Sequence, residues 1–372
     1  MQVSAPKRIL IICHEASFTG APVLLLELVR FMVKERKDKL RIVIVRGGML
    51  EKEFEKWGKT TVLKPEGYSQ AKGLSKMGMI IRNRLLVVST FYQSLRSDLI
   101  FSNSIVNGFV LDWLRFSGRS IYTYVHELKS VIDLYLQQGN AKGSFRFSHL
   151  FLYPCNAVKN NLIENYQVDP GKLKRLNYYF ENPGIVEQAE QDQSSGITVC
   201  GAGTVSRRKG TDLFIEIAKK VNTIDASVRF VWFGSFEDKE SEHHYRKLSM
   251  LPDGTNVIDF GGFLSPEMMR KQYKYFDVFL LTSREDPYPL VVIEAAFSQK
   301  PALVFEEGGG ITEFVEGCGW ILKNTDSMAE TILQTTKEQF HQKGILARDK
   351  ALNLHANKLR LTEQLAGIFS SL

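Results

Sequence analysis

The sequence predicts an α/β protein of two domains, each a doubly wound parallel sheet covered by helices. Three observations lead to this prediction. The chain has 372 residues, 44% of them apolar and 24% charged, which suits two soluble domains of ordinary size. Short apolar runs alternate with helix-like segments along the whole chain, as in successive βαβ units. Both halves also open alike, with a strand, a turn of small residues and a helix.

Seven apolar runs are the predicted strands. The first follows the opening MQVSAPKR and is too short for the apolar core of a signal peptide, so it predicts a buried strand. No apolar run approaches the ~20 residues needed to cross a bilayer. The predicted strands are Ile9–Cys13, Arg41–Val45, Leu99–Ser102, Ile121–Val125, Ile197–Cys200, Val228–Phe233 and Val278–Leu281.

A polar stretch, FENPGIVEQAEQDQSS at residues 180–195, is the predicted linker between the domains. We therefore place the first domain at residues 1–182 and the second at residues 183–351. A C-terminal helix, at about residues 352–372, is expected to pack back onto the first domain.

Charge is unevenly divided between the two halves. Residues 1–182 contain 27 Lys and Arg against 15 Asp and Glu, a net +12, whereas the remainder contains 21 against 26, a net −5. This asymmetry favours an anionic partner for the first domain, although a solvated basic surface is an open alternative. Within that half, residues 71–96 join an apolar run to basic residues, which is typical of a helix lying on an anionic membrane. A core helix with a solvated basic face is the other interpretation. The basic residues are Lys72, Lys76, Arg82, Arg84 and Arg96.

Cysteine and histidine spacings predict neither a metal centre nor a disulfide framework. Cys13, Cys155, Cys200 and Cys318 lie far apart and form no C-x-x-C pair, which favours a reducing cytoplasm. The adjacent histidines at 243–244 lack a third ligand at metal spacing and are expected on the surface.

Two carboxylates stand on either side of a proline-rich turn in REDPYPLVVIEAAFSQKP, residues 284–301. The prolines bias Asp286 toward an extended turn, and Pro289 suits the first turn of a helix that carries Glu294. Free N–H groups of Leu290 and Val291 at the helix start would attract an anion. Glu294 is then either a ligand-binding carboxylate or a structural one bonded to nearby backbone.

The small-residue turns after the two opening strands, HEASFTGAP and TVSRRKGTD, are the expected ligand-binding ends of the sheets. Neither is a G-x-G-x-x-G dinucleotide fingerprint or a P-loop, which disfavours a dinucleotide-dependent oxidoreductase and a P-loop kinase. Arg207, Arg208 and Lys209 beside a helix start favour phosphate binding over plain solvated surface.

These segments together resemble the retaining glycosyltransferases of family 4, whose GT-B fold has two Rossmann-like domains facing a deep cleft. The resemblance covers most of the chain, and its segments are specific as a set. They are TGAP at 19–22, VHEL at 125–128, CNAVKNNL at 155–162, GTVSRRKGTDLF at 203–214, REDPYPLVVIEA at 284–295 and GGITEF at 309–314.

The resemblance implies that Glu294 accepts hydrogen bonds from the ribose of a sugar nucleotide, while Asp286 and the amides after it hold the transferred sugar. The sequence departs from the usual pattern, because Asp286 replaces a longer glutamate and the prolines beside it lack N–H groups. The family's phosphate-binding arginine falls at Thr204, so Arg208 next to Lys209 is expected to replace it.

Other positions follow from the same resemblance. Gly20 and Ala21 would lie at the diphosphate, together with the helix start at Leu290 and Val291. His126 would lie near the transferred sugar and the acceptor. Phe260 and Gly262, in VIDFGGFLS, would form a loop beside the nucleobase, and Gly309 and Gly310 would serve backbone geometry.

The function implied is transfer of a sugar from a nucleotide-diphosphate sugar to an acceptor hydroxyl in glycan, polysaccharide or glycolipid synthesis, with retention of anomeric configuration. We expect no cofactor and no metal, because the chain has no Asp-x-Asp motif. The acceptor would be a glycan or a lipid-linked molecule, and the site of action the cytoplasm or the inner membrane face. Two alternatives are a GT-B epimerase or phosphorylase and a non-enzymatic basic binding module. No nucleic-acid motif supports a nucleic-acid partner.

Overall fold

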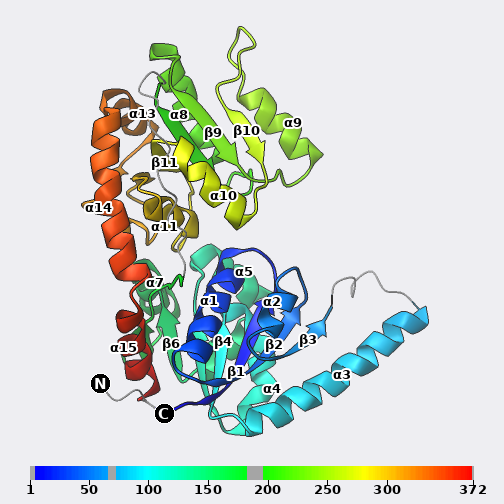
Figure 1. The fold of residues 1–372 in the computed structure, drawn as a ribbon. Coiled ribbons are helices and arrows are strands. Elements are labelled where there is room, and N and C mark those ends of the chain that lie inside the picture. Colours follow the sequence, from blue (N-terminus) through cyan, green and yellow to red (C-terminus); the bar gives the residue numbers. More distant parts are fainter. Residues whose placement is uncertain (1–4, 66–72, 182–195, 371–372) are drawn as a thin grey trace. The chain divides into compact units, whose positions relative to one another are not determined.

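The computed structural model describes residues 5–65, 73–181 and 196–370, with backbone alone for residues 73–76. The chain divides into two compact units, one formed by Met1–Glu181 with Asn357–Leu372 and the other by Asn182–Ala356. Each unit contains one parallel sheet with helices packed around it (Figure 1), which confirms the predicted fold class. Most of the predicted linker, residues 182–195, lies outside the described residues.

The sheet of the first unit has seven strands in the order β3-β2-β1-β4-β5-β6-β7. The chain runs outward from β1 to one edge and then returns to β4 on the other side of β1. The strand order thus reverses between β1 and β4, the place where open α/β sheets bind ligands. The strands are β1 (Arg8–Glu15), β2 (Lys39–Arg46), β3 (Lys59–Lys64), β4 (Leu99–Asn103), β5 (Ser120–Tyr124), β6 (Leu150–Tyr153) and β7 (Leu173–Arg175).

Helices connect these strands, because parallel neighbours need a crossover. The long α3 lies beside β3 and α4, and its N-terminal end extends away from the sheet (Figure 1). The α-helices of this unit are α1 (Gly20–Lys34), α2 (Glu51–Glu55), α3 (Gly73–Leu95), α4 (Gly108–Leu114), α5 (Lys129–Gln137), α6 (Lys142–Phe147), α7 (Asn156–Tyr166) and α15 (Lys358–Phe369).

The second unit repeats this plan with six strands in the order β10-β9-β8-β11-β12-β13. Its strand order reverses between β8 and β11. The strands are β8 (Thr198–Ala202), β9 (Arg229–Phe233), β10 (Asp259–Gly262), β11 (Val278–Leu281), β12 (Ala302–Phe305) and β13 (Trp320–Leu322). The α-helices are α8 (Thr211–Ile224), α9 (Lys239–Leu248), α10 (Pro266–Gln272), α11 (Leu290–Phe297), α12 (Thr312–Val315), α13 (Thr325–Gln334) and α14 (Lys337–His355).

The C-terminal helix begins later than predicted. α14 continues to His355 in the second unit, where Ala351 and His355 are buried. Asn357 then starts α15 by accepting a hydrogen bond from the Arg360 N–H. The helix that belongs to the first unit therefore starts at Lys358 rather than at about residue 352.

Both cores consist of buried strands enclosed by apolar helix faces. Ile9–Cys13 in β1 are fully buried, which confirms the prediction of a buried first strand. Parallel sheets covered on both faces need such continuous apolar runs. All seven predicted strands are present, and the four cysteines are buried and free of disulfides.

Candidate functional site

The turn between β8 and α8 depends on glycine at two positions. Gly203 has a φ of +144° and Gly210 a φ of +70°, a region that side-chain-bearing residues rarely adopt. A Cβ at Gly210 would lie 1.8 Å from the Thr282 carbonyl oxygen. The turn therefore packs directly against the carboxyl end of β11. This is the place where the strand order of the sheet reverses, between β8 and β11.

Two predicted phosphate-binding cations lie in this turn but in different environments. The Arg208 side chain is exposed, and it makes no ion pair within the described part of the chain. The Lys209 side chain is only 19% exposed and pairs with Asp286, with 2.5 Å between Nζ and Oδ2. Lys209 is less exposed than Arg208 because its stem packs along Gly203.

Arg284 holds the same turn in place, and the sequence interpretation gave it no role. Its guanidinium forms two 2.7 Å hydrogen bonds with the Asp212 carboxylate and one of 2.6 Å with the Arg207 carbonyl. Its backbone N–H donates to the Arg208 carbonyl at 3.0 Å. Arg284 thereby connects the cationic turn to the segment that contains Asp286. The bidentate Arg–carboxylate geometry depends on tertiary contact across 72 positions, which no local pattern reveals.

The loop around Asp286 is held by the glycine pair that follows β12. The Gly310 N–H donates to the Pro287 carbonyl at 3.0 Å. Gly309 has a φ of +93°, and a Cβ there would lie 2.0 Å from the Asp286 carbonyl oxygen. The prediction that Gly309 serves backbone geometry is confirmed, since any side chain would displace the Asp286 backbone.

α11 presents free amides at its start. The helix begins at Leu290, one residue later than predicted, and Pro289 is its N-cap. The N–H groups of Leu290 and Val291 meet no acceptor among the described residues, because they precede the first intrahelical bond. Such groups are suited to bind an anion.

Glu294 lies in the middle of α11, on a helix whose other residues are mostly buried and apolar. Within the described residues its half-buried carboxyl group has no hydrogen-bond partner. Burial raises its pKa from 4.5 to about 7, and the charge of Arg270 partly opposes that rise. The structural alternative, a carboxylate bonded to nearby backbone, therefore does not describe Glu294.

Phe260 and Gly262 lie on the edge strand β10, so the prediction that they form a loop is wrong. The strand pairs with β9, with Phe260 opposite Trp232, and the apolar partner explains why this segment joins the sheet. The Phe260 ring packs against Phe236, with 5.2 Å between centroids, and beside the Arg246 guanidinium. Gly262 has a φ of +70° at the carboxyl end of the strand.

In the first unit, His126 follows β5 and has both ring nitrogens occupied. Nε2 lies 2.9 Å from the Asn103 Oδ1 and Nδ1 lies 3.2 Å from the Tyr178 hydroxyl. Burial lowers the pKa of His126 to about 3, and the nearby His14 adds to this effect. The imidazole is therefore neutral at physiological pH.

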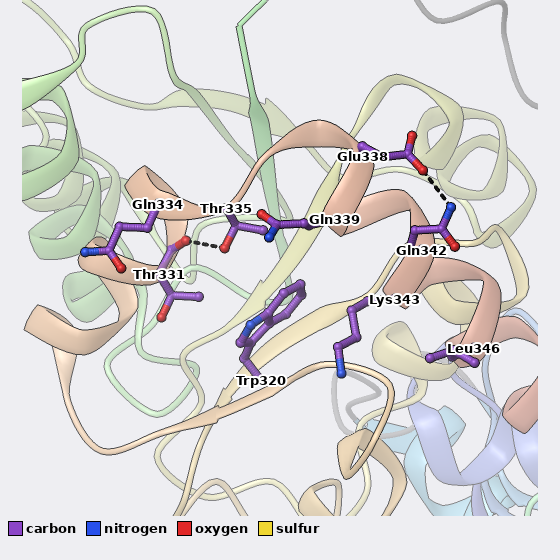
Figure 2. Close-up of a pocket in the computed structure, with 9 residues that line it drawn as sticks. All are labelled: Trp320, Thr331, Gln334, Thr335, Glu338, Gln339, Gln342, Lys343 and Leu346. Carbon is purple, nitrogen blue, oxygen red and sulfur yellow. Dashed lines mark hydrogen bonds between the residues drawn. The ribbon is translucent and has the colours of Figure 1, made fainter.

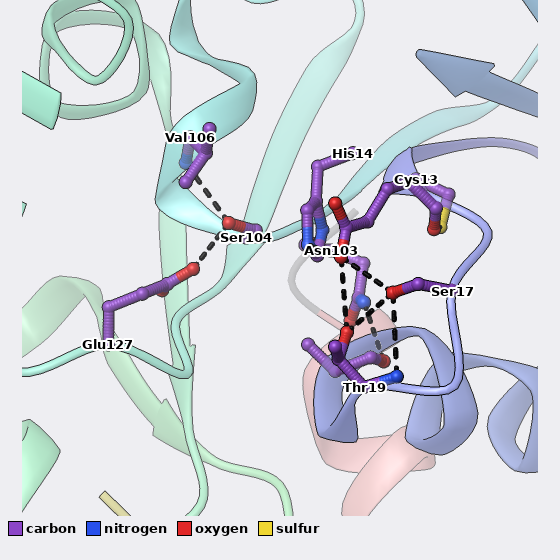
Figure 3. A network of polar contacts seen from close by, with 10 residues as sticks. Cys13, His14, Ser17, Thr19, Asn103, Ser104, Val106 and Glu127 are labelled. Atoms are coloured by element: carbon purple, nitrogen blue, oxygen red, sulfur yellow. Dashed lines mark hydrogen bonds and ion pairs between the residues drawn. The ribbon is translucent and has the colours of Figure 1, made fainter. Parts of the chain in front are cut away.

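The turn between β1 and α1, which contains Ser17 and Thr19 (Figure 3), leads into Gly20 and Ala21 at the start of α1. Their N–H groups meet no acceptor among the residues that the structure describes. The Glu15 carboxylate shapes this turn by accepting from the Ser17 hydroxyl at 2.6 Å and the Thr19 hydroxyl at 3.2 Å. Glu15 is thus engaged in the turn itself.

Ser104 and Glu127 form a second network at the same edge of the sheet (Figure 3). The Ser104 hydroxyl donates to the Glu127 carboxylate and accepts from the Val106 N–H at 3.1 Å. Ser104 has a φ of +138°, a strained value for a residue with a side chain. Burial raises the pKa of Glu127, whereas the hydrogen bond from Ser104 opposes that rise.

The structure thus brings together Arg208, Lys209 and Asp286 in one unit, and the Ala21 turn with His126 in the other. None of them lines a cavity of about 540 Å³ elsewhere in the second unit (Figure 2). Its lining includes Trp320, Gln339 and Lys343.

Over the described parts of the chain, no three His, Cys, Asp or Glu side chains are grouped so that they could hold a metal ion. The histidines at 243–244 are exposed on α9, as predicted. Within the same residues, no helix combines the length and apolarity needed to span a bilayer.

Family models match both halves of the chain. Residues 5–135 match the model described as glycosyl-transferase family 4, and residues 196–338 match the model described as glycosyl transferases group 1. An alpha-galactosylglucosyldiacylglycerol synthase of Streptococcus pneumoniae is 36% identical over 109 residues, 28% of each chain. A lipopolysaccharide 1,2-N-acetylglucosaminetransferase of Salmonella typhimurium is 30% identical over 120 residues, 31% of each chain. The chain thus matches less than a third of the length of these curated relatives.

Solved structures match over nearly the whole chain. HepE of Anabaena, solved with UDP and glucose, has a TM-score of 0.78 at 16% identity and covers 98% of this chain and 100% of its own. TarM, also solved, has a TM-score of 0.73 at 14% identity and covers 99% of this chain and 100% of its own. The fold is therefore GT-B.

Proposed function

The chain is built from a family 4 glycosyltransferase domain followed by a group 1 glycosyltransferase domain, and we propose that it transfers a sugar from a nucleoside diphosphate to an acceptor hydroxyl. The observation that carries this proposal is the contact between Lys209 and Asp286. It joins the cationic turn before α8 to the acidic loop before α11, which supports a proposed phosphate site next to a proposed sugar site.

The ribose, the diphosphate and the transferred sugar of the donor then each have a partner in the second unit. The ribose hydroxyls donate to the Glu294 carboxylate, which is partly buried and has no hydrogen-bond partner among the described residues. The diphosphate binds Arg208, Lys209 and the free amides at the start of α11, while Asp286 holds the transferred sugar. Preorganised cations and helix amides stabilise the negative charge that develops on the leaving group.

The proposed reaction retains anomeric configuration and needs no metal. The bond between the anomeric carbon and the phosphate oxygen breaks, and the acceptor oxygen forms a bond on the same face. The acceptor proton passes to the departing phosphate, so no carboxylate nucleophile is required. His126 is neutral and has both ring nitrogens engaged, which suits it to orient groups rather than to remove a proton.

Donor binding is the direct test of this proposal. A ligand that binds only the folded protein raises its melting temperature. We expect a rise with one of UDP, GDP or ADP, a further change with a matching sugar nucleotide, and sugar transfer to a lipid-linked or glycan acceptor. No shift with any of these nucleotides, together with no transfer, would refute the proposal.

Helix α3 suggests which kind of acceptor the protein uses. Among the described side chains of this helix, six large apolar ones are exposed, which contradicts the alternative of an ordinary core helix. Their spacings of three and four residues put them on one face. They are Met77, Ile81, Leu85, Val88, Tyr92 and Leu95, and we call them the α3 stripe.

We propose that the α3 stripe lies on an anionic membrane, at its inner face, where a lipid-linked acceptor is available. Exposed Arg82 and Arg84 accompany the stripe, Arg96 stacks on Tyr92, and residues 73–95 contain no acidic side chain. Two copies of such a helix would repel each other, whereas anionic lipid complements it. Lys72 lies outside the described residues, and the side chain of Lys76 is not described. Two curated relatives are named for glycolipid and lipopolysaccharide synthesis, which supports this choice of acceptor.

A further inference from the structure

Asn103 connects two predicted site elements of the first unit. It is the last residue of β4 and is fully buried. Its Nδ2 donates to the Ala21 carbonyl at 2.9 Å, and its Oδ1 lies 2.9 Å from the His126 Nε2. Its backbone carbonyl lies 3.3 Å from the His14 Nδ1 (Figure 3 shows Asn103 beside His14). One amide therefore joins the β1–α1 turn to the loop after β5.

The Ala21 contact determines which way this amide is turned. A backbone carbonyl is only an acceptor, so the group facing Ala21 must be the NH₂. The amide oxygen must then face His126, and the Nε2 of that ring must carry the hydrogen. In the neutral ring Nδ1 is left as an acceptor, and the Tyr178 hydroxyl is placed to donate to it.

Two tyrosine rings lie beside the His126 ring. Tyr124 is tilted against it, with 4.2 Å between ring centroids, and the Tyr178 centroid lies 5.7 Å away. The titratable neighbours are His14 from β1 and Glu127, whose carboxylate accepts the His126 backbone N–H at 2.8 Å. Glu127 bonds backbone and Ser104, and in the described residues no contact joins it to the imidazole. Asn103 is thus the side chain that determines the state of Nε2.

We propose that Asn103 is a positioning residue that keeps His126 in its Nε2–H form and fixes it to the β1–α1 turn. The functional part rests on the proposed glycosyl transfer and on the roles that the sequence resemblance implies for Ala21 and His126. The chemical part concerns only the ring and its tautomer. Ala21 and His126 both bond the Asn103 side chain, so a shift of either one would break a hydrogen bond to Asn103.

Nitrogen-detected NMR of the histidine rings in the wild-type protein tests the chemical part directly. We expect the His126 ring to be neutral from pH 5 to 8 with its proton on Nε2. A proton on Nδ1 would overturn the proposal. In Asn103→Asp the amide donor to Ala21 is lost and a carboxylate faces Nε2, so the pKa of His126 should rise by about one unit or more.

Asn107→Asp is the matched control. Asn107 is also fully buried and donates to the Ile12 carbonyl and the Ser102 hydroxyl, both at 3.2 Å, and among the described residues it makes no hydrogen bond to His126. An equal pKa change in both variants would overturn the proposal, because it would reflect burial of a charge alone.

Kinetics test the functional part. We expect Asn103→Asp to lower kcat/KM by about 10²-fold, as for a misplaced reacting group, and to give the pH profile a new limb at the pKa of His126. Asn107→Asp should show no new limb. A wild-type protein that transfers no sugar would refute the proposed function, while the NMR result would still decide the role of Asn103. Unchanged kinetics and pH profile in Asn103→Asp would refute the positioning role.

Discussion

Lys209 and Asp286 lie 77 positions apart in the sequence and form an ion pair with 2.5 Å between Nζ and Oδ2. Their side chains are 19% and 10% exposed. Each therefore neutralises the other in a partly desolvated site, and a bound phosphate would have to share Lys209 with Asp286. The stability of each residue therefore depends on the presence of the other. Arg208, the exposed neighbour of Lys209, has no such dependence on Asp286.

Alanine at Arg208 or Lys209 should lower turnover by about 10²-fold, the scale of losing one preorganised charge contact. Stability should distinguish them. Arg208→Ala should keep the melting temperature, because its side chain is exposed. Lys209→Ala should lower the free energy of unfolding by about 3 kcal/mol, because Asp286 is left buried and unpaired. Steady-state kinetics and urea titration measure both effects.

The double variant Lys209→Ala with Asp286→Ala is the control for that prediction. If the ion pair explains the loss, removing both partners should destabilise less than the sum of the two single changes. Near-normal turnover in Lys209→Ala would show that Lys209 is not part of the phosphate site.

Glu294 and Asp286 should affect different parts of the donor. Glu294→Gln should weaken binding of the bare nucleoside diphosphate, because the proposed ribose contact would be made with or without the sugar. Asp286→Asn should mainly weaken binding of the sugar nucleotide. Calorimetric titration with both ligands separates the two effects, and equal losses for the bare nucleotide would contradict this division.

Stability should depend on pH through Glu294. The pKa of this carboxyl is about 7 in the folded protein against an ordinary 4.5, so the unfolded chain releases its proton at lower pH. The contribution of Glu294 is therefore most favourable below about pH 4.5 and is lost as pH rises to about 7. Glu294→Gln should gain stability over the wild type between pH 5 and 8. Urea titrations at both pH values measure this, and a constant difference would contradict the raised pKa.

Gly309→Ala should disrupt the loop that presents Asp286. A methyl group there would meet the Asp286 carbonyl at 2.0 Å in a backbone with a φ of +93°. Gly317→Ala is the control, since its φ is +82° but no atom lies within 4 Å of the added Cβ. The control should cost about 1–2 kcal/mol from backbone conformation alone. Gly309→Ala should cost more and should also weaken sugar-nucleotide binding, which Gly317→Ala should not.

The α3 stripe should bind anionic vesicles. Co-sedimentation should occur with anionic lipid at low salt, decrease at ~0.15 M salt, and be absent with neutral lipid. Leu85→Ser with Val88→Ser, or Arg82→Glu with Arg84→Glu, should abolish it. Lys239→Glu with Lys247→Glu on the exposed face of α9 is the matched charge control and should bind as the wild type does. Binding lost equally in that control, or a dimer that the serine variant dissolves, would contradict a lipid partner.

Transfer should survive chelation. Among the described residues no cluster of His, Cys, Asp or Glu could hold a divalent ion, and in the proposed reaction cations and helix amides would bind the leaving diphosphate. Activity measured with and without excess EDTA should agree. Loss of activity that Mg²⁺ or Mn²⁺ restores would contradict the prediction.

Local patterns were sufficient to predict much of this protein. Apolar runs predicted seven strands, because a strand buried on both faces must be continuously apolar. Glycine and proline predicted the turns, because they alone suit certain backbone angles. The edge strand that contains Phe260 was missed, since a short half-buried segment with two glycines has the pattern of a loop.

Tertiary structure decided the state of each charged or titratable group. The contacts of Lys209 with Asp286, of Arg284 with Asp212 and of Asn103 with Ala21 join residues more than 70 positions apart. The raised pKa of Glu294 and the lowered pKa of His126 arise from burial among neighbours supplied by other segments. Sequence alone determined which elements form, because that depends on local periodicity and backbone preference. Folding decided which side chains pair, because the distances between charged groups and their removal from water are set only when the chain packs.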